Sequence, residues 1–238
     1  MKKIMFCEQY GLMQAVLEGR KTMTRRTLPK HVQLALEKSA TGVLIIPKTA
    51  IPEGMSIEQF CEEWSQQPGR PITVHPSAEV IPPKWEDILK KALEYSTYKV
   101  GEVVAIAQRY TDIEWRNNPY CEIPDLSFNG QLAKSKGWKN KMYVRADLMP
   151  HRIRITNVRI ERIQDISDED CMREGVRKLE SDGCPTMFTF DGWRFKNKVN
   201  RCTDSPKEVF EALFKKLSGR KVWDDNPWVF VYEFELVK

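Results

Sequence analysis

The sequence has few histidines and no closely paired cysteines, and both features bear on metal sites. Its three histidines lie far apart, at positions 31, 75 and 151, and its six cysteines include no C-x-x-C pair. Zinc sites are typically built from such closely spaced ligands, so we expect no metal site and no bound cofactor. Irregularly spaced cysteines without an export signal are typical of reduced thiols in the cytoplasm.

Long hydrophobic runs are also missing. No apolar stretch approaches the roughly 18–20 residues of a membrane span. The basic N-terminal tip is followed by Glu8 too early for the apolar core of a signal peptide. We therefore expect a cytoplasmic protein that does not associate with membranes. Its 238 residues include 7 Trp, 10 Phe and 7 Tyr, enough to build a folded core and to exclude disorder throughout.

The net charge of +5 is small, but its distribution is uneven. Residues 19–30 contain five basic residues and no acidic one, and residues 138–162 contain seven basic residues against two acidic ones. The remainder of the chain is therefore net acidic. Basic stretches on such a background are typical of a partner that carries phosphate, although a single stretch is also compatible with a solvated surface.

Helical and strand periodicities follow one another without a regular order. Helical spacing covers residues 8–18, 57–64, 85–95, 168–174 and 206–218. Strand patterns cover residues 42–47, 103–107, 142–145, 152–160 and 228–236, and loop signals fill 68–83, 111–140 and 181–204. Strands that are not separated by regular helices favour an α+β fold with a mainly antiparallel, barrel-like sheet over a doubly wound fold.

The stretch at 152–160 changes its hydrophobic parity part of the way along. Ile153 and Ile155 share one parity, whereas Val158 and Ile160 share the other. Because neighbouring side chains of a strand point to opposite faces, this change predicts a β-bulge or bend near Thr156 and Asn157.

The segment Gly19–Arg26 (G-R-K-T-M-T-R-R) is the first candidate for chemistry. We expect a polar connection here and not a buried strand. Lysine is the basic side chain whose pKa falls most readily on burial or beside other cations. Lys21 could then take a proton from a hydroxyl such as that of Thr24, provided that the chain turns after Gly19. The alternative is a basic, exposed link between a helix and a strand.

Two acidic segments are weaker candidates. Glu174 lies in the last turn of its expected helix, where the helix dipole disfavours an acid by roughly 0.3–1 kcal/mol. It is either a solvated glutamate or one that is held there for a purpose. Asp224 and Asp225 could contribute to a metal site, but the following Asn226-Pro227 favours a turn into the last strand.

Several of these segments, in this order, resemble the ASCH domain, a relative of the PUA fold that is associated with RNA. The similar pieces are Leu17–Arg26, Val100–Ile106, Arg154–Ser167, Glu174–Val176 and Trp223–Phe234. They span nearly the whole chain and are most similar to the larger ASCH proteins of bacteria, phages and prophages. The resemblance implies a single PUA-like domain with a β-barrel flanked by helices. Residues of about 31–97 and 181–204 have no counterpart in small ASCH proteins and are expected to be insertions.

The resemblance also implies a reaction. Some small bacterial ASCH proteins are amidohydrolases that remove acetyl from 4-acetylcytidine with a lysine, a threonine and a later glutamate. Position by position these become Lys21 as base, Thr24 as nucleophile, and Glu174 as the group that orients or shuttles protons. Other ASCH proteins are associated with RNA cleavage, so a nuclease and a non-catalytic RNA-binding module stay open as alternatives. None of this predicts an oligomeric state.

The two basic stretches, together with Arg109 at the exit of the 103–107 strand, supply the candidates for contact with RNA or a modified nucleoside. These are Arg20, Thr22, Arg25, Arg26, Arg109, Arg145, Arg152 and Arg154. One departure from the larger relatives follows the 103–107 strand, where they carry Arg-Glu and then a Trp. This chain has Ala107–Tyr110 (A-Q-R-Y) instead, and the loss of that acid argues against a metal-dependent reaction.

Overall fold

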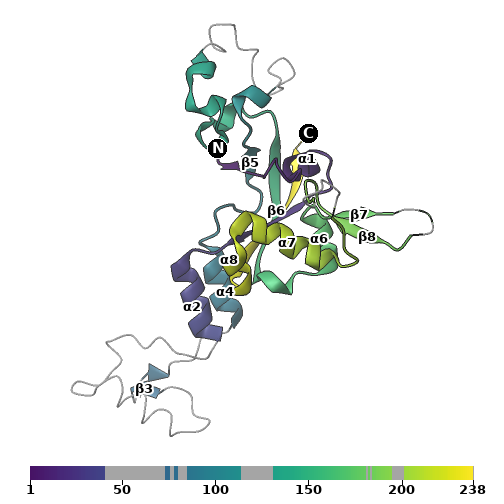
Figure 1. The fold of residues 1–238 in the computed structure, drawn as a ribbon. Helices are drawn as coiled ribbons and strands as arrows, with labels where there is room; N and C mark the ends of the chain where they lie inside the picture. The colour runs from purple at the N-terminus through teal and green to yellow at the C-terminus, as the bar shows by residue number, and fades with distance from the viewer. Residues whose placement is uncertain are drawn as a thin grey trace. The chain divides into compact units, whose positions relative to one another are not determined.

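The computed structural model describes residues 1–40, 73–75, 78–79, 85–113, 131–180, 182, 184–194 and 201–237 (Figure 1). The chain divides into two compact units. The first comprises Met1–Leu28 and Ser96–Lys238, and the second comprises Pro29–Tyr95.

A five-stranded sheet forms the centre of the first unit. Its strand order is β1 (Lys3–Ile4), β5 (Val103–Ile106), β6 (Arg152–Arg162), β9 (Trp228–Val237) and β2 (Met23–Thr27). β1 and β5 run parallel, and the other three neighbouring pairs are antiparallel. The predicted α+β class with a mainly antiparallel sheet is therefore confirmed. Four consecutive apolar residues of β9, at positions 229–232, are buried, so both faces of this central strand are covered.

The predicted bulge in β6 is also confirmed. The pairing of β6 with β9 joins Ile155 to Phe234 and then Asn157 to Glu233, so Thr156 is the extra residue. This insertion moves the side chains beyond it to the opposite parity. Arg159 and Glu161 are thereby placed on the face of the sheet that also carries Arg25 of β2.

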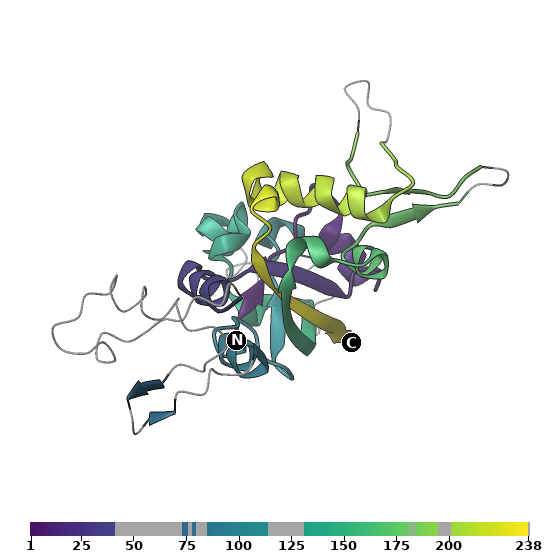
Figure 2. The same ribbon diagram turned by 90° about the horizontal axis from the view of Figure 1, so that it is seen from below.

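Helices complete the first unit, and two of them begin at the serine caps that the sequence predicts. They are α1 (Leu12–Leu17), α6 (Asp168–Arg173), α7 (Pro206–Ser218) and α8 (Arg220–Asp224), with 3₁₀ turns at 110–112, 136–138, 141–143, 146–148 and 163–165. Ser167 and Ser205 each accept a hydrogen bond from a backbone N–H in the first turn of α6 and α7. Figure 2 shows α7 beside the sheet, where its apolar side chains are buried.

Three local predictions for the first unit are wrong, and so is one for the second unit, because the loop expected at 68–83 contains the paired strands β3 (Thr73–His75) and β4 (Ala78–Glu79). The expected strand at 142–145 is instead the 3₁₀ turn η5 (Lys141–Tyr143), because the Asn140 side chain accepts the backbone N–H of Met142 and favours a turn. The expected loop at 181–204 contains β8 (Met187–Thr189), which pairs with β7 (Arg177–Leu179). The segment 20–26 was not expected to form a buried strand. Its second half nevertheless belongs to β2, whose first three residues are buried.

The described strands do not close into a barrel. β1 and β2 stand at opposite ends of the strand order and do not pair with each other, so the predicted barrel is not confirmed. β1 has only two residues, too few to form a long ladder with β2. A side chain joins these two parts of the sheet instead, since Arg26 Nη2 donates to the carbonyl oxygen of Met5 at 2.6 Å.

The second unit contains the helices α2 (Lys30–Ala40) and α4 (Trp85–Leu93) and the strands β3 (Thr73–His75) and β4 (Ala78–Glu79). α4 confirms the predicted helix at 85–95, and α2 and α4 pack against each other. The strand expected at 42–47 and the helix expected at 57–64 lie outside the described residues. That this unit is an insertion into an ASCH domain stays a prediction. Within the described ranges, no helix has the length and apolar character to cross a bilayer.

Candidate functional site

One cavity of the first unit gathers the three residues predicted to be catalytic. It has a volume of about 350 Å³. Lys21, Thr24 and Glu174 all line it: Thr24 lies in β2, Lys21 lies two residues before β2, and Glu174 caps the end of α6. The other lining residues are Met5, Phe6, Cys7, Leu12, Arg25, Arg26, Lys141, Phe210, Leu213, Phe214, Leu217 and Ser218. The cavity therefore lies between the β2 edge of the sheet, the segment after β1, and α7.

Lys21 and Glu174 form a buried ion pair. Lys21 Nζ lies 2.6 Å from Glu174 Oε2 and also donates to the Glu174 carbonyl oxygen at 2.7 Å. The two side chains are 2% and 6% exposed. Desolvation lowers the pKa of Lys21, and the nearby Glu174 carboxylate opposes this effect without reversing it. Lys21 is thus closer to losing its proton than a solvated lysine.

Arg25 holds the same carboxylate from the other side. Arg25 Nη1 lies 3.1 Å from Glu174 Oε1, so the two oxygens of this carboxylate have different cationic partners. Arg25 also donates to Glu161 and Asp170, at 2.6 and 2.7 Å from Nη2. Although desolvation opposes it, attraction to these three carboxylates raises the pKa of Arg25. The guanidinium therefore stays charged and fixes the orientation of Glu174.

The register of the sheet explains this convergence. Arg25 pairs with Val231 of β9, and Val231 pairs with Arg159 of β6, so the two arginines lie on one face of the sheet. Asp170 of α6 accepts from both arginines. Arg159 also pairs with Glu233. The pKa of Glu233 is lowered, mainly because its carboxylate accepts a hydrogen bond from Arg173. An ion-pair network thus covers this face and docks α6 against it.

Strand alternation places Thr24 on the opposite face from Arg25. Both nevertheless line the cavity, because β2 is an edge strand and the cavity extends around its edge. Thr24 is 5% exposed. A hydroxyl from one face and a lysine–glutamate pair from the other are therefore available to the same small ligand.

Gly175 lies against the aliphatic part of the Lys21 side chain. Its φ of +106° lies in a region that side-chain-bearing residues rarely adopt. A Cβ at this position would lie 3.2 Å from Leu12 Cδ2 and 3.6 Å from Lys21 Cδ. A glycine at this position therefore allows the backbone after α6 to pass close to the Lys21 side chain.

We expect Gly175→Ala to lower the stability of the protein. The strained backbone costs about 1–3 kcal/mol, and the new methyl group presses against Leu12. Chemical denaturation monitored by tryptophan fluorescence measures this change. Gly101→Ala is the matched control, because Gly101 also has a positive φ, of +83°, but nothing lies within 4 Å of its added Cβ. Equal losses in the two variants would show that the contacts behind Lys21 add nothing to the backbone strain.

The helix α7 builds an apolar wall for the cavity. Phe210, Leu213 and Phe214 are buried on α7, and Phe210 and Phe214 also pack against Trp223 of α8 at centroid distances of 6.1 and 5.8 Å. The Arg25 guanidinium carbon lies 5.9 Å from the Phe210 ring centroid. The cavity thus combines a charged end with an aromatic one, the usual composition of a small-molecule site.

The structure separates the predicted binding residues. Arg25 and Arg26 line the cavity, whereas Arg20, Thr22, Arg109, Arg145, Arg152 and Arg154 do not. Arg20 pairs with Glu18, Arg109 with Glu8 and Asp112, Arg145 with Asp147, and Thr22 accepts from Arg173. Arg154 lies 3.7 Å from Glu235, and Arg152 is paired with the terminal residue Val237 of β9 in the strand register. From the second basic stretch, residues 138–162, Lys141 alone lines the cavity, so the two stretches contribute to it unequally.

Sequence reasoning missed the carboxylates that surround Arg25 and the role of α7. Glu161, Asp170 and Glu233 are ordinary charged residues in sequence, and only the strand register brings them to the arginines. The α7 wall could have been suspected, because its helical spacing of apolar residues predicts a buried face. Among the residues whose placement is described, no group of three or more His, Cys, Asp or Glu could hold a metal ion.

Comparisons with protein-family models, with curated proteins and with solved structures found no match for this chain.

Proposed function

We propose that this protein is an amidohydrolase that removes an acyl group from a modified nucleoside of the 4-acetylcytidine type. The observation that carries the proposal is that Lys21, Thr24 and Glu174 line one cavity with the lysine–glutamate pair buried at 2.6 Å. A lysine with a lowered pKa and a hydroxyl that line the same cavity are groups that acyl transfer needs. The resemblance to the ASCH domain assigns the same three positions.

The proposed reaction proceeds through an acyl-enzyme. Neutral Lys21 takes the proton of the Thr24 hydroxyl as its oxygen attacks the amide carbonyl. Lys21 then gives this proton to the amine of cytidine, which leaves as the C–N bond breaks. Water, deprotonated by Lys21, attacks the threonine ester and releases acetate, and the proton returns to Thr24. Glu174 orients the lysine and stabilises its protonated form in each half of the cycle.

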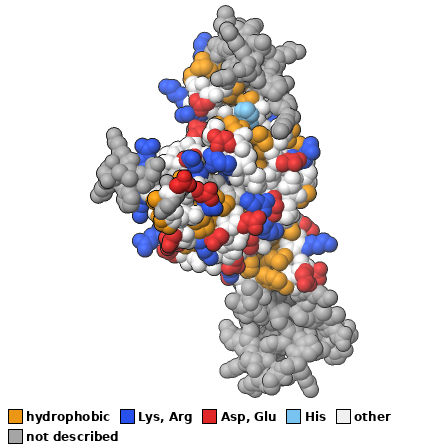
Figure 3. Space-filling model, turned by 90° about the vertical axis from the view of Figure 1, so that its right-hand side faces the viewer, with side chains coloured by type: hydrophobic (Ala, Val, Ile, Leu, Met, Phe, Trp, Pro, Cys, Tyr) orange, Lys and Arg blue, Asp and Glu red, His pale blue; other side chains and the backbone are white. Residues whose placement is uncertain are grey.

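A small substrate suits this cavity better than a nucleic-acid strand. A volume of about 350 Å³ lies at the low end of the range for small-molecule sites, roughly 300–1,000 Å³. Of the predicted binding arginines outside the cavity, Arg20, Arg109, Arg145 and Arg154 are each paired with an acid. On the face shown in Figure 3, basic and acidic side chains are interspersed, without the continuous basic groove that binding of single strands requires.

Two further expectations are part of this proposal. The sheet would be an opened PUA-like barrel in which the Arg26–Met5 bridge and the cavity replace the missing ladder. A cytoplasmic location fits the free thiols of Cys7, Cys171, Cys184 and Cys202.

The test is incubation of the purified protein with 4-acetylcytidine and chromatography of the products. We expect cytidine and acetate in equal amounts, at a rate proportional to protein concentration. The variant Thr24→Val is assayed in parallel, because it keeps the shape of the side chain and removes the hydroxyl that is proposed to attack. Cytidine formation by the variant at the wild-type rate, or no cytidine from either protein, would contradict the proposal. In the second case, RNA binding and RNA cleavage are assayed with oligonucleotides at two salt concentrations.

A further inference from the structure

The four cations that line the cavity differ in what they bind. Lys21 and Arg25 are bonded to buried carboxylates, as described above. Arg26 has no such partner, since within the described part of the chain its guanidinium makes one hydrogen bond, to the carbonyl oxygen of Met5. A neutral carbonyl oxygen does not cancel a positive charge. Arg26 also lies close enough to Lys21 for its charge to contribute to the lowered pKa of that lysine.

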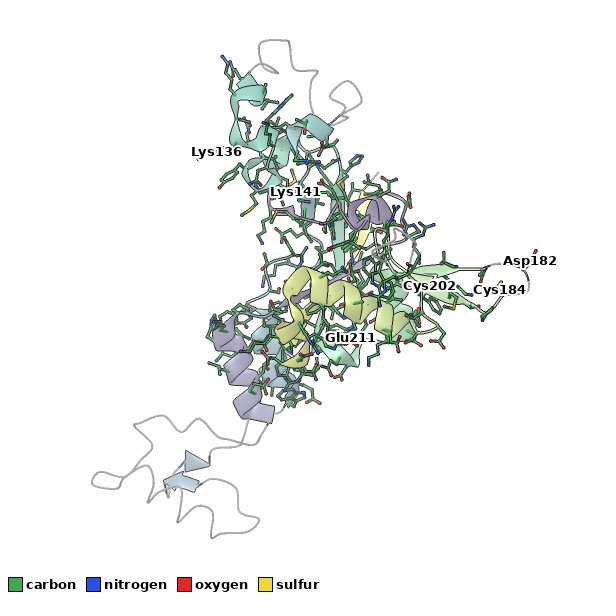
Figure 4. All side chains as sticks on the ribbon, viewed as in Figure 1. Lys136, Lys141, Asp182, Cys184, Cys202 and Glu211 are labelled. Carbon is green, nitrogen blue, oxygen red and sulfur yellow. The ribbon has the colours of Figure 1, made fainter. Side chains whose placement is uncertain are left out.

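Lys141 approaches the same stretch of backbone as Arg26. Lys141 of η5 donates from Nζ to the carbonyl oxygen of Phe6 at 2.5 Å, one residue after the carbonyl that Arg26 binds. Both side chains line the cavity, and they donate to carbonyl oxygens of neighbouring residues. Figure 4 labels Lys141 on its segment.

Glu8 contacts both Lys141 and Arg109. Lys141 Nζ lies 3.1 Å from Glu8 Oε1, while Glu8 Oε2 lies 3.2 Å from Arg109. Arg109 also pairs with Asp112 at 2.6 Å, so Lys141 has Glu8 as its acidic partner, whereas no described carboxylate pairs with Arg26. This part of the cavity consequently carries an excess of positive charge, in contrast to the balanced end around Glu174.

We infer that Arg26 and Lys141 form an anion subsite that holds the phosphate of a mononucleotide. The inference rests on the proposed function for the nucleoside part of the substrate, and it assigns the substrate class as acylated cytidine monophosphate. Arg26 keeps most of its five N–H donors, in a planar arrangement that matches phosphate oxygens. In this arrangement the phosphate would lie near Met5 and Phe6 and the aromatic base would face the α7 wall, all of which line the cavity.

The subsite can be tested without any reaction. We would titrate the wild-type protein with cytidine, with cytidine 5′-monophosphate and with inorganic phosphate by isothermal calorimetry at low salt. We expect the monophosphate to bind at least about tenfold more tightly than cytidine, and we expect this advantage to shrink as salt is raised. In Arg26→Gln the advantage is lost, in Arg26→Lys part of it remains, and in Lys141→Met it is reduced.

The matched control is Arg220→Gln. Arg220 lies on α8, is 84% exposed at its side chain and does not line the cavity, so this variant removes one positive charge elsewhere. It should keep the full advantage of the monophosphate. Thermal melting confirms that each variant is folded.

The outcomes separate this inference from the proposed function. Equal affinities for cytidine and its monophosphate overturn the subsite, as does an advantage that survives in both Arg26→Gln and Lys141→Met. Absence of binding by all three ligands also overturns it. A retained phosphate advantage without any hydrolysis of 4-acetylcytidine or its 5′-monophosphate overturns the proposed reaction and leaves the subsite standing.

Discussion

Replacing Lys21 with Arg should abolish hydrolysis while the protein stays folded. Arginine keeps the positive charge beside Glu174 but does not release its proton at any accessible pH. A general base contributes about 10²–10⁴-fold to a rate, so we expect kcat to fall by at least about 10²-fold. Lys21→Met, which removes both charge and base, should lose as much. The measurement is steady-state hydrolysis of 4-acetylcytidine.

The pH dependence of the wild type supports the same assignment. Lys21 acts as a base only when neutral, so the rate should rise with pH and level off above the lowered pKa of this lysine. The stability should change in the same direction. Between that lowered pKa and the ordinary lysine value the unfolded chain holds more protons, so the free energy of unfolding rises with pH. This contribution is fully present above the ordinary value and is lost as pH falls through the lowered one.

A surface lysine provides the control. Lys178 is 49% exposed, pairs with Glu180 and does not line the cavity, so Lys178→Met should keep the rate and the pH profile. Retention of more than a tenth of the activity in Lys21→Arg would contradict the role of Lys21 as base. It would leave charge stabilisation as its function.

Among the variants proposed here, replacing Arg25 with Met should lower the free energy of unfolding the most. The Arg25 side chain is 1% exposed and contacts the carboxylates of Glu161, Asp170 and Glu174. Its removal leaves these acids close together with fewer cations between them. Removing one partner of a buried pair costs about 3–5 kcal/mol, and we expect a loss of this size at neutral pH, measured by denaturant unfolding.

Two further variants distinguish charge from packing. Arg25→Lys keeps a charge but cannot bridge three carboxylates, so it should show an intermediate loss. In Arg25→Met combined with Glu161→Gln, part of the lost stability should return, because one of the repelling acids is gone. Arg154→Met is the control, since Arg154 is 52% exposed and contacts Glu235 at 3.7 Å. It should change stability by no more than about 0.5 kcal/mol. A similar loss in Arg25→Met and Arg154→Met would refute the role of Arg25 in holding the network.

The elements that depend on local patterns could be predicted from the sequence. The alternation of β9, the parity change within β6 and the serine caps of α6 and α7 are all signals carried by a few neighbouring residues. Each reflects a period or a hydrogen bond within one element, so no tertiary contact is needed to predict it. The α+β class with a mainly antiparallel sheet followed from their order.

The burial of β2 was decided only by the tertiary structure. A segment with three arginines and a lysine between positions 20 and 26 is expected to remain in water. Arg25 is buried because Glu161 and Asp170, more than 130 residues away in sequence, neutralise it. The sheet register that brings them together is a property of three strands at once.

The residues of the candidate site were likewise predictable only in part from the sequence. The identities of Lys21, Thr24 and Glu174 were proposed from the sequence through their resemblance to a known pattern, and the prediction that Arg145, Arg152 and Arg154 accompany them came from charge alone. The structure brings the first three residues to one cavity and leaves the arginines outside it. Charge along a sequence says how many basic groups there are, but the pairing of strands decides which of them share a cavity and which of them meet an acid.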